Sequence, residues 1–150
     1  MTPLREIVTQ TIGRVLGEAA FIFTDILDND SKPRAETWDA DGVSLRFAGT
    51  PSGEIRMWVG SAFACIAAAN MLGIDTGSDE ARVKGLDALK ELLNMIVGNF
   101  ITEAYGETPV FVLGLPSTIA NDQKAHDVGD PDAVWFEAEG STVMFIVRAA

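Results

Sequence analysis

Apolar residues in the first part of the chain recur at the spacing of an α-helix. Between residues 2 and 20 they mark one helical face, at Leu4, Ile7, Val8, Ile12, Val15, Leu16 and Ala19. Thr2 is suited to cap such a helix and Pro3 to occupy its first turn. The pattern predicts an amphipathic helix over residues 2–20, and the apolar run after it predicts a strand over residues 21–27.

The middle of the chain changes from a period of two to a helical period. Residues 42–49 and 53–60 alternate between apolar and polar side chains around the turn sequence Thr-Pro-Ser-Gly, which predicts a β-hairpin. Residues 61–73 are apolar and rich in alanine, which predicts a short helix that packs closely on a neighbour. A long helix is expected from residue 79 to about residue 104, closed near Gly106.

The last third of the chain predicts three further strands. Residues 109–116 are typical of a buried strand, and residues 134–140 and 141–149 of a hairpin around Glu-Gly. Residues 28–36 and 117–133 are polar and are expected to form loops, the second of them mobile. Six strands with helices gathered against them predict one α+β domain over all 150 residues, with a largely antiparallel sheet.

A short motif occurs twice in the chain. Residues 67–73 and 91–98 both contain Asn-Met followed by apolar sequence and a glycine. The repetition indicates two related β-β-α halves. A chance similarity stays open as the alternative, because the shared segment is so short.

Composition and charge narrow the classes of partner and site. The formal net charge of −11 argues against nucleic acid and against an anionic membrane surface, because both would repel the chain. No apolar run approaches the roughly 20 residues that cross a bilayer, so membrane insertion is not expected. A single cysteine, Cys65, excludes an internal disulfide and favours a reducing cytoplasm. With only His126 beside it, a structural zinc site and other metal sites of this chain's own are not expected.

The long predicted helix has an unusual polar side. Asp87, Glu91, Asn94 and Gly98 follow one another at intervals of four, three and four residues, so they form a stripe about 60° wide opposite the apolar face. Asn is a weak helix former, and Gly costs roughly 1 kcal/mol against Ala in a helix interior. The stripe therefore predicts a rigid docking surface. Two alternatives stay open, namely a solvated polar face and a glycine that lets a neighbouring helix of the same chain approach.

The sequence around this stripe resembles the CheC/CheX/FliY family of bacterial chemotaxis phosphatases, and CheX most. The family motif is an acidic residue or serine, then Glu four positions later, then Asn three positions after that. Asp87, Glu91 and Asn94 match it in full. The segments 60–73 and 111–119 resemble the family's flanking segments. The resemblance implies a CheC-like domain with a six-stranded sheet and two pseudo-repeated β-β-α halves.

The resemblance also implies an activity, the hydrolysis of the aspartyl phosphate on a CheY-like response regulator. It implies that Asn94 positions the attacking water and that Glu91 pairs with a lysine of the regulator. Asp87 would support the helix or its contacts, and Gly98 would let the partner come close. No cofactor of the protein's own is implied, because the Mg²⁺ ion belongs to the response regulator. A homodimer is implied by resemblance to CheX.

One position departs from the two-site members of the family. They have Glu where this chain has Ala67, although Asn70 remains, and this agrees with the single-site pattern of CheX. Asn70 is therefore expected to cap, to pack or to face solvent.

Two other functions remain in consideration. One is a non-catalytic CheX-like adaptor or dimerisation module that binds receiver domains. The other is a purely structural dimer domain whose polar stripe is left to solvent. Exposure of Glu91 and Asn94 would favour the phosphatase or the adaptor, whereas burial of both beneath another element would favour the structural domain.

Overall fold

The structure is a computed structural model, and it describes residues 3–149. In chain order the elements are α1 (Leu4–Ala20), β1 (Thr24–Ile26), η1 (Asn29–Ser31), β2 (Ala40–Ala48), β3 (Gly53–Gly60), α2 (Ser61–Leu72), α3 (Asp79–Tyr105), β4 (Val112–Leu113), β5 (Ser117–Thr118), η2 (Asn121–Gln123), α4 (Lys124–Val128), β6 (Val134–Ala138) and β7 (Ser141–Ala149).

One antiparallel sheet forms the middle of the molecule. Its strands lie in the order β1-β6-β7-β3-β2-β4, and β5 pairs with β2 farther along the edge that β4 occupies. The predicted α+β class and antiparallel sheet are confirmed. The sheet has seven strands rather than six, because the two-residue β5 adds to the predicted set.

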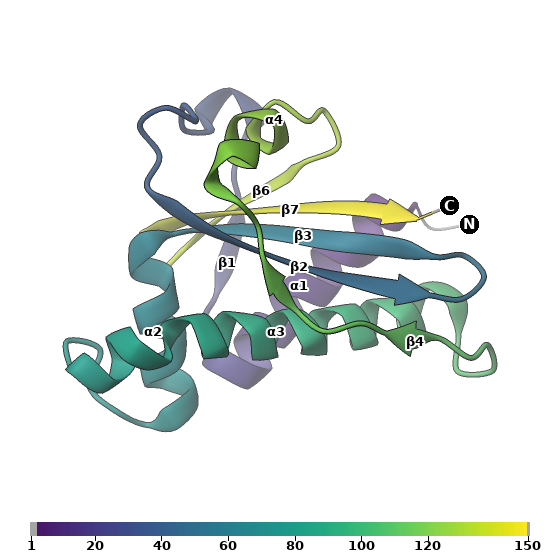
Figure 1. Ribbon diagram of the computed structural model, residues 1–150, viewed down its shortest axis with the longest axis horizontal. Helices are drawn as coiled ribbons and strands as arrows, with labels where there is room; N and C mark the ends of the chain where they lie inside the picture. Colours follow the sequence, from purple (N-terminus) through teal and green to yellow (C-terminus); the bar gives the residue numbers. More distant parts are fainter. Residues whose placement is uncertain (1–2, 150) are drawn as a thin grey trace.

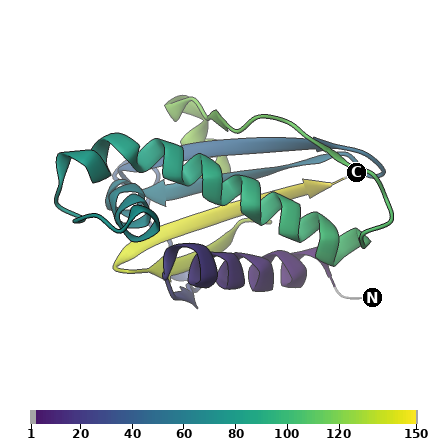
Figure 2. The same ribbon diagram turned by 90° about the horizontal axis from the view of Figure 1, so that it is seen from below.

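The helices divide unequally between the two faces of the sheet. Figure 1 shows α1, α2 and α3 beneath the sheet and α4 above it. In Figure 2, α1 and α3 run side by side across the lower face, with α2 at one end. We call this lower face the helical face. Because successive strand residues point to opposite faces, each central strand supplies one set of apolar side chains to each side.

The main core lies between the sheet and α1–α3. Strand residues that point to the helical face include Val43, Leu45, Phe47, Ile55, Met57, Val59, Val134, Phe136, Val143 and Phe145. A smaller cluster lies on the opposite face and contains Trp38, Trp58, Val128, Trp135, Met144 and Ile146. The three tryptophans are therefore core residues.

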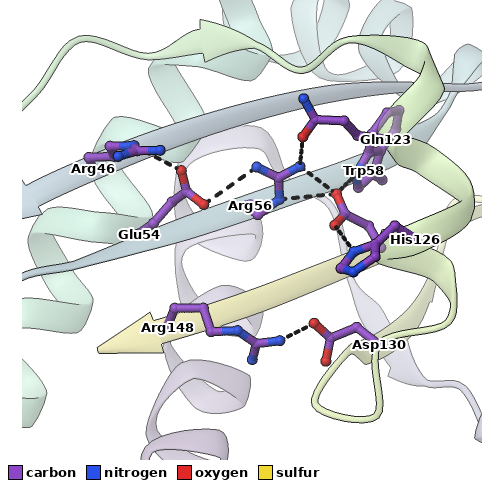
Figure 3. Close-up of polar contacts among 9 residues, drawn as sticks. Arg46, Glu54, Arg56, Trp58, Gln123, His126, Asp130 and Arg148 are labelled. Carbon is purple, nitrogen blue, oxygen red and sulfur yellow. Dashed lines mark hydrogen bonds and ion pairs between the residues drawn. The ribbon is translucent and has the colours of Figure 1, made fainter. Parts of the chain in front are cut away.

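Residues 119–133, the α4 segment, cover part of this second face through charged contacts. The buried carboxylate of Asp127 accepts hydrogen bonds from Arg56 Nε at 3.0 Å and from Trp58 Nε1 at 2.7 Å. Arg56 Nη2 also donates to Gln123 Oε1 at 2.7 Å (Figure 3). Burial lowers the pKa of the Arg56 guanidinium, but hydrogen bonding and attraction by Asp127 outweigh it, so the pKa is raised. The arginine is therefore charged throughout the physiological range.

The prediction of a loop over residues 117–133 is wrong. The segment contains β5, η2 and α4, and it is tied down by Asp127 and by Lys124, whose ammonium donates to the carbonyl of Trp38. The sequence pattern was misleading because two of its polar residues, Lys124 and Asp127, are partners of groups on other elements.

Two predicted strands are shorter than expected. In residues 21–27 only Thr24–Ile26 form a strand, because Phe21 ends α1 in the left-handed conformation at φ 55°. In residues 109–116 only Val112–Leu113 pair with the sheet, and the expected burial is wrong, since Val110 and Leu115 are exposed. Prolines and a glycine limit pairing in that segment.

The remaining boundaries agree closely with the sequence. Both predicted hairpins form, and the second turns through Glu139 and Gly140, which both have positive φ. α1 starts at Leu4 after Pro3, while the predicted cap Thr2 lies outside the described residues. The second hairpin follows α3 in the chain and lies beside the first through pairing of β3 with β7. Among residues 3–149, no helix is both long and apolar enough to cross a bilayer.

Candidate functional site

The 27-residue helix α3 is a well-anchored scaffold for the predicted stripe. Ser78 caps its start by accepting a hydrogen bond from the amide of Ala81 at 3.1 Å, and Asp79 and Glu80 place negative charge in its first turn. At its end the amide of Gly106 donates to the carbonyl of Thr102 at 2.9 Å. The helix therefore has ordered ends on both sides of the candidate site, as the sequence predicted.

One side of α3 is held by the core. Its buried residues are Ala81, Gly85, Ala88, Leu89, Leu92, Leu93, Ile96, Val97, Phe100 and Ile101. Gly85 permits a close approach of α2, because a Cβ placed there would lie 3.0 Å from the Cβ of Ala64. The apolar face consequently fixes both the position of the helix and its rotation about its own axis.

The other side of α3 carries the predicted residues. Asp87, Glu91 and Asn94 are all exposed, and Gly98 is partly exposed. Residues three and four apart on a helix have Cβ atoms about 5–6 Å from each other, so these side chains form a continuous ridge. The structure thus places the four residues on one accessible surface.

Gly98 has no packing role within the described part of the chain. A Cβ placed on it would meet nothing within 4 Å, so the alternative in which it admits a neighbouring helix of the same chain is wrong. Gly85 has that role instead. Gly98 leaves a gap in the ridge next to Asn94, where another molecule has room to approach.

Asn70 occupies a structural position. Its side-chain amide donates a hydrogen bond of 2.8 Å to the carbonyl of Ala20, the last residue of α1. This contact satisfies a carbonyl that the helix itself leaves unpaired. The expectation that Asn70 caps or packs agrees with this contact.

The ridge offers a carboxylate and a carboxamide but no nucleophile with an adjacent base. His126 is exposed and Cys65 is only partly buried, and both lie on other elements. Within residues 3–149, no group of three or more His, Cys, Asp or Glu side chains is arranged to hold a metal ion. The ridge is therefore suited to hydrogen bonding and charge pairing with a group that another molecule supplies.

A hollow of about 360 Å³ opens on one flank of the N-terminal half of α3. Leu86 and Leu89 of α3 line it, together with Ala64 of α2. At its rim the Asp41 carboxyl has a raised pKa, chiefly because of burial and secondly because of repulsion by Asp39. The sequence analysis did not identify this hollow, whose lining includes residues from β2, β3, α2, α3, β5 and η2.

Two exposed apolar residues near the ridge were also missed. Val83 and Leu86 are 68% and 40% exposed, although the other leucines, isoleucines and valines of α3 are buried. Their positions three residues apart, outside the apolar face at 89–101, were a signal that the sequence analysis passed over.

Solved structures with this arrangement come from chemotaxis and motility proteins. CheX from Vibrio vulnificus has a TM-score of 0.73 at 16% identity, with 99% of this chain and 97% of that chain covered. A chain of the CheX–CheY–BeF₃–Mg²⁺ complex from Borrelia burgdorferi has a TM-score of 0.68 at 18% identity, with 99% of both chains covered. FliY from Thermotoga maritima has a TM-score of 0.57 at 14% identity, with 97% of this chain and 91% of that chain covered. At such low identity these likenesses show the fold alone.

The family is shown by the sequence itself. The pattern of the family described as chemotaxis phosphatase CheX matches residues 42–137, which include the whole ridge. No curated protein matches the chain significantly. The chain belongs to the CheX family of chemotaxis phosphatases, as the resemblance predicted.

The open space around Gly98 leads to a stability prediction. We expect Gly98→Ala to raise the free energy of unfolding by about 0.5–1 kcal/mol, because Ala is the better helix former and its methyl group meets no neighbour. Gly73→Ala is the control, and it should lower the free energy of unfolding by about 1 kcal/mol because Gly73 has φ 70°. Urea unfolding measures both, and a destabilised Gly98→Ala would show that the chain does pack against this position.

Proposed function

We propose that the protein hydrolyses the aspartyl phosphate of a CheY-like response regulator in the cytoplasm, with the ridge of α3 inserted into the regulator's active site. The observation that carries the proposal is the exposed Glu91–Asn94 pair on a helix whose opposite side is fully packed, in a chain of the CheX family. The solved CheX–CheY–BeF₃–Mg²⁺ complex of a protein with this fold supports a receiver domain as the partner.

The proposed reaction needs little chemistry from this chain. Water attacks the phosphorus, the bond from phosphorus to the aspartate oxygen breaks, and inorganic phosphate and a free carboxylate are released. Such a transfer depends mainly on in-line positioning and on neutralisation of the phosphoryl charge. The receiver supplies the phosphoaspartate and the Mg²⁺ ion, so this chain needs no cofactor.

Asn94 is proposed to position the water. A carboxamide can accept one hydrogen bond from the water and donate another, and it adds no negative charge beside the phosphoryl oxygens. A carboxylate at the same place would be repelled by those oxygens. The helix supports this role, because a side chain on a rigid element is held more closely in the productive geometry.

Glu91 is proposed to pair with a lysine of the receiver. It lies three residues before Asn94, so an ion pair there would hold the ridge in register while Asn94 enters the active site. Asp87 extends the polar ridge by a further turn, and Gly98 provides the gap through which the receiver approaches. Both are proposed as partner contacts and not as catalytic groups.

The first test replaces Asn94. We expect Asn94→Ala to abolish phosphate release from a Mg²⁺-loaded, phosphorylated receiver domain and to leave thermal unfolding unchanged, because the side chain is exposed. Asn29→Ala, another exposed asparagine on η1, serves as the matched control and should retain full activity. Equal rates for wild type and Asn94→Ala would refute the role of Asn94.

The second test replaces Glu91. We expect Glu91→Ala to raise KM for the phosphorylated receiver several-fold and Glu91→Lys to raise it further, because lysine adds repulsion of the partner's ammonium group. An exposed ion pair contributes about 0.2–1 kcal/mol, so the loss for alanine should stay near fivefold or below. Steady-state phosphate release with varied receiver concentration measures it. A fall in kcat with unchanged KM would assign Glu91 to the chemistry instead.

The proposal includes a homodimer. Of the two edges of the sheet, the β1 edge is a better candidate for the dimer interface than the β4 edge. β1 pairs with β6 on one side only, and Phe21, Phe23 and Ile26 around it are 66%, 80% and 74% exposed. Exposed strand edges with apolar side chains pair readily with another chain.

Light scattering tests this interface. We expect wild type to have the mass of a dimer and Phe23→Glu to have the mass of a monomer. Val110→Glu, which changes an exposed valine next to the opposite edge strand β4, should remain a dimer. The reverse result would place the interface at that opposite edge.

The adaptor alternative predicts a different pattern. A non-catalytic module would bind receiver domains and leave their dephosphorylation at the spontaneous rate. The presence of both Glu91 and Asn94 supports turnover, because an adaptor has no use for a carboxamide aimed at the phosphoryl group.

A further inference from the structure

Two apolar side chains on α3 are exposed to solvent. Val83 is 68% exposed and Leu86 is 40% exposed, while the other leucines of α3, Leu89, Leu92 and Leu93, are buried. Valine is also a weaker helix former than the residues that usually occupy exposed helix positions. Val83 and Leu86 lie three residues apart, so their side chains are neighbours on the helix surface.

This apolar pair is continuous with the ridge. Val83 precedes Asp87 by one helical turn and Glu91 by two, which places it roughly 12 Å from Glu91 along the helix axis. An interface of ordinary size covers about 800 Å² on each partner, which corresponds to a radius of roughly 16 Å. A receiver domain whose contact area is centred between Val83 and Asn94 would therefore cover both residues, each about 8 Å from that centre along the helix axis.

The surface beside Leu86 is concave. The hollow of about 360 Å³ has Leu86, Leu89 and Ala64 among its apolar lining residues. Asp41 and Arg82 add charged groups to the lining, and Arg82 pairs with Asp79 at 3.2 Å. Val83 and Leu86 thus lead from the polar ridge to a depression that can accept a protruding side chain of a partner.

The polar ridge alone is a weak basis for affinity. An exposed ion pair at Glu91 contributes about 0.2–1 kcal/mol. A group that acts on the transition state, as proposed for Asn94, raises kcat without strengthening binding of the substrate. Stable engagement of a partner needs buried apolar contacts near the centre of the interface.

We infer that Val83 and Leu86, with the hollow beside them, form an apolar docking shelf for the receiver domain that carries the phosphoaspartate. The inference rests on the proposed function, and it divides the surface of α3 by role. The shelf in the N-terminal half of the helix sets the affinity for the receiver. Glu91 orients the bound receiver, and Asn94 positions the water that hydrolyses the phosphoaspartate. The receiver is the occupant because the shelf and the ridge share one helix and lie within the area of a single interface.

The experiment separates affinity from turnover. Binding of a CheY-type receiver domain loaded with Mg²⁺ and beryllofluoride is measured by calorimetry, and phosphate release from the phosphorylated receiver gives KM and kcat. We expect Val83→Glu to raise both Kd and KM about tenfold and to leave kcat within about twofold of wild type, since buried interface anchors contribute more than 1 kcal/mol. Val83→Ala should change Kd in the same direction by a smaller factor. Alanine favours the helix, so this loss would not come from unfolding.

Val110→Glu is the matched control. It places the same charge on a valine that is 85% exposed and precedes Phe111 in the chain. Phe111 stacks on Tyr105 at the C-terminal end of α3, which is about 33 Å from Val83 along the helix axis. Kd and KM should be unchanged in this variant. An equal loss for Val83→Glu and Val110→Glu would show a general charge effect and would overturn the shelf.

The remaining outcomes distinguish the two proposals. Normal Kd and KM for Val83→Glu, in an assay where wild type is active and Asn94→Ala is not, would overturn the shelf and leave the phosphatase site intact. Weakened binding for Val83→Glu together with a fully active Asn94→Ala would support the shelf and refute the proposed role of Asn94. A wild-type protein that neither binds nor dephosphorylates receiver domains would refute both.

Discussion

The packing of one side of α3 against the sheet and against α2 is the interaction on which the rest of the molecule depends. Leu89, Leu92, Leu93, Ile96 and Phe100 are each fully buried on that side. Burial of a large apolar side chain contributes roughly 1.5–3 kcal/mol, so this face outweighs the few tenths of a kcal/mol by which Asn94 disfavours a helix. The residues on the exposed side are consequently not needed for core packing, so they can be selected for contact with a partner. The close contact at Gly85 and Ala64 also keeps the helix from rotating, which holds the ridge in a fixed direction.

On the opposite face of the sheet, charged contacts rather than apolar packing fix the position of the α4 segment. Asp127 is buried against Arg56 and Trp58, where it satisfies both donors and joins the α4 segment to β3. Removing one member would leave an uncompensated buried group, which is more costly than replacing the whole set by apolar residues. This network therefore specifies where the α4 segment lies, whereas the apolar core beneath the sheet supplies most of the stability. The two faces of β3 show the division, with Met57 directed to the helices and Trp58 to the α4 segment.

The features that depend on local periodicity could be predicted from the sequence. The features that depend on contacts between residues distant in the chain could not. The long helix and both hairpins follow from spacing and turn residues, and the ridge follows from the positions of Asp87, Glu91 and Asn94 within one helix. The α4 segment was misjudged because the pairing of Asp127 with Arg56 joins residues far apart in the chain, and polarity alone does not reveal it. Residues 109–116 were misjudged for the converse reason. Apolar composition favours burial, but here only Phe111 and Leu113 pack against the main core, with Phe111 against Phe47 and Tyr105.

The proposed activity explains why the candidate site is a ridge and not a pocket. An enzyme that acts on a small ligand usually encloses it and supplies nucleophile, base and charge stabilisation from its own residues. The phosphoaspartate and metal ion of a receiver domain already lie in a pocket of that domain. A recessed site on the partner could not reach them, whereas a protruding ridge can. What remains to be supplied is an ordered water and a stable docking geometry. Asn94 on a rigid helix can supply the first, and the apolar shelf at Val83 and Leu86, one to three turns away, is in the correct place to supply the second.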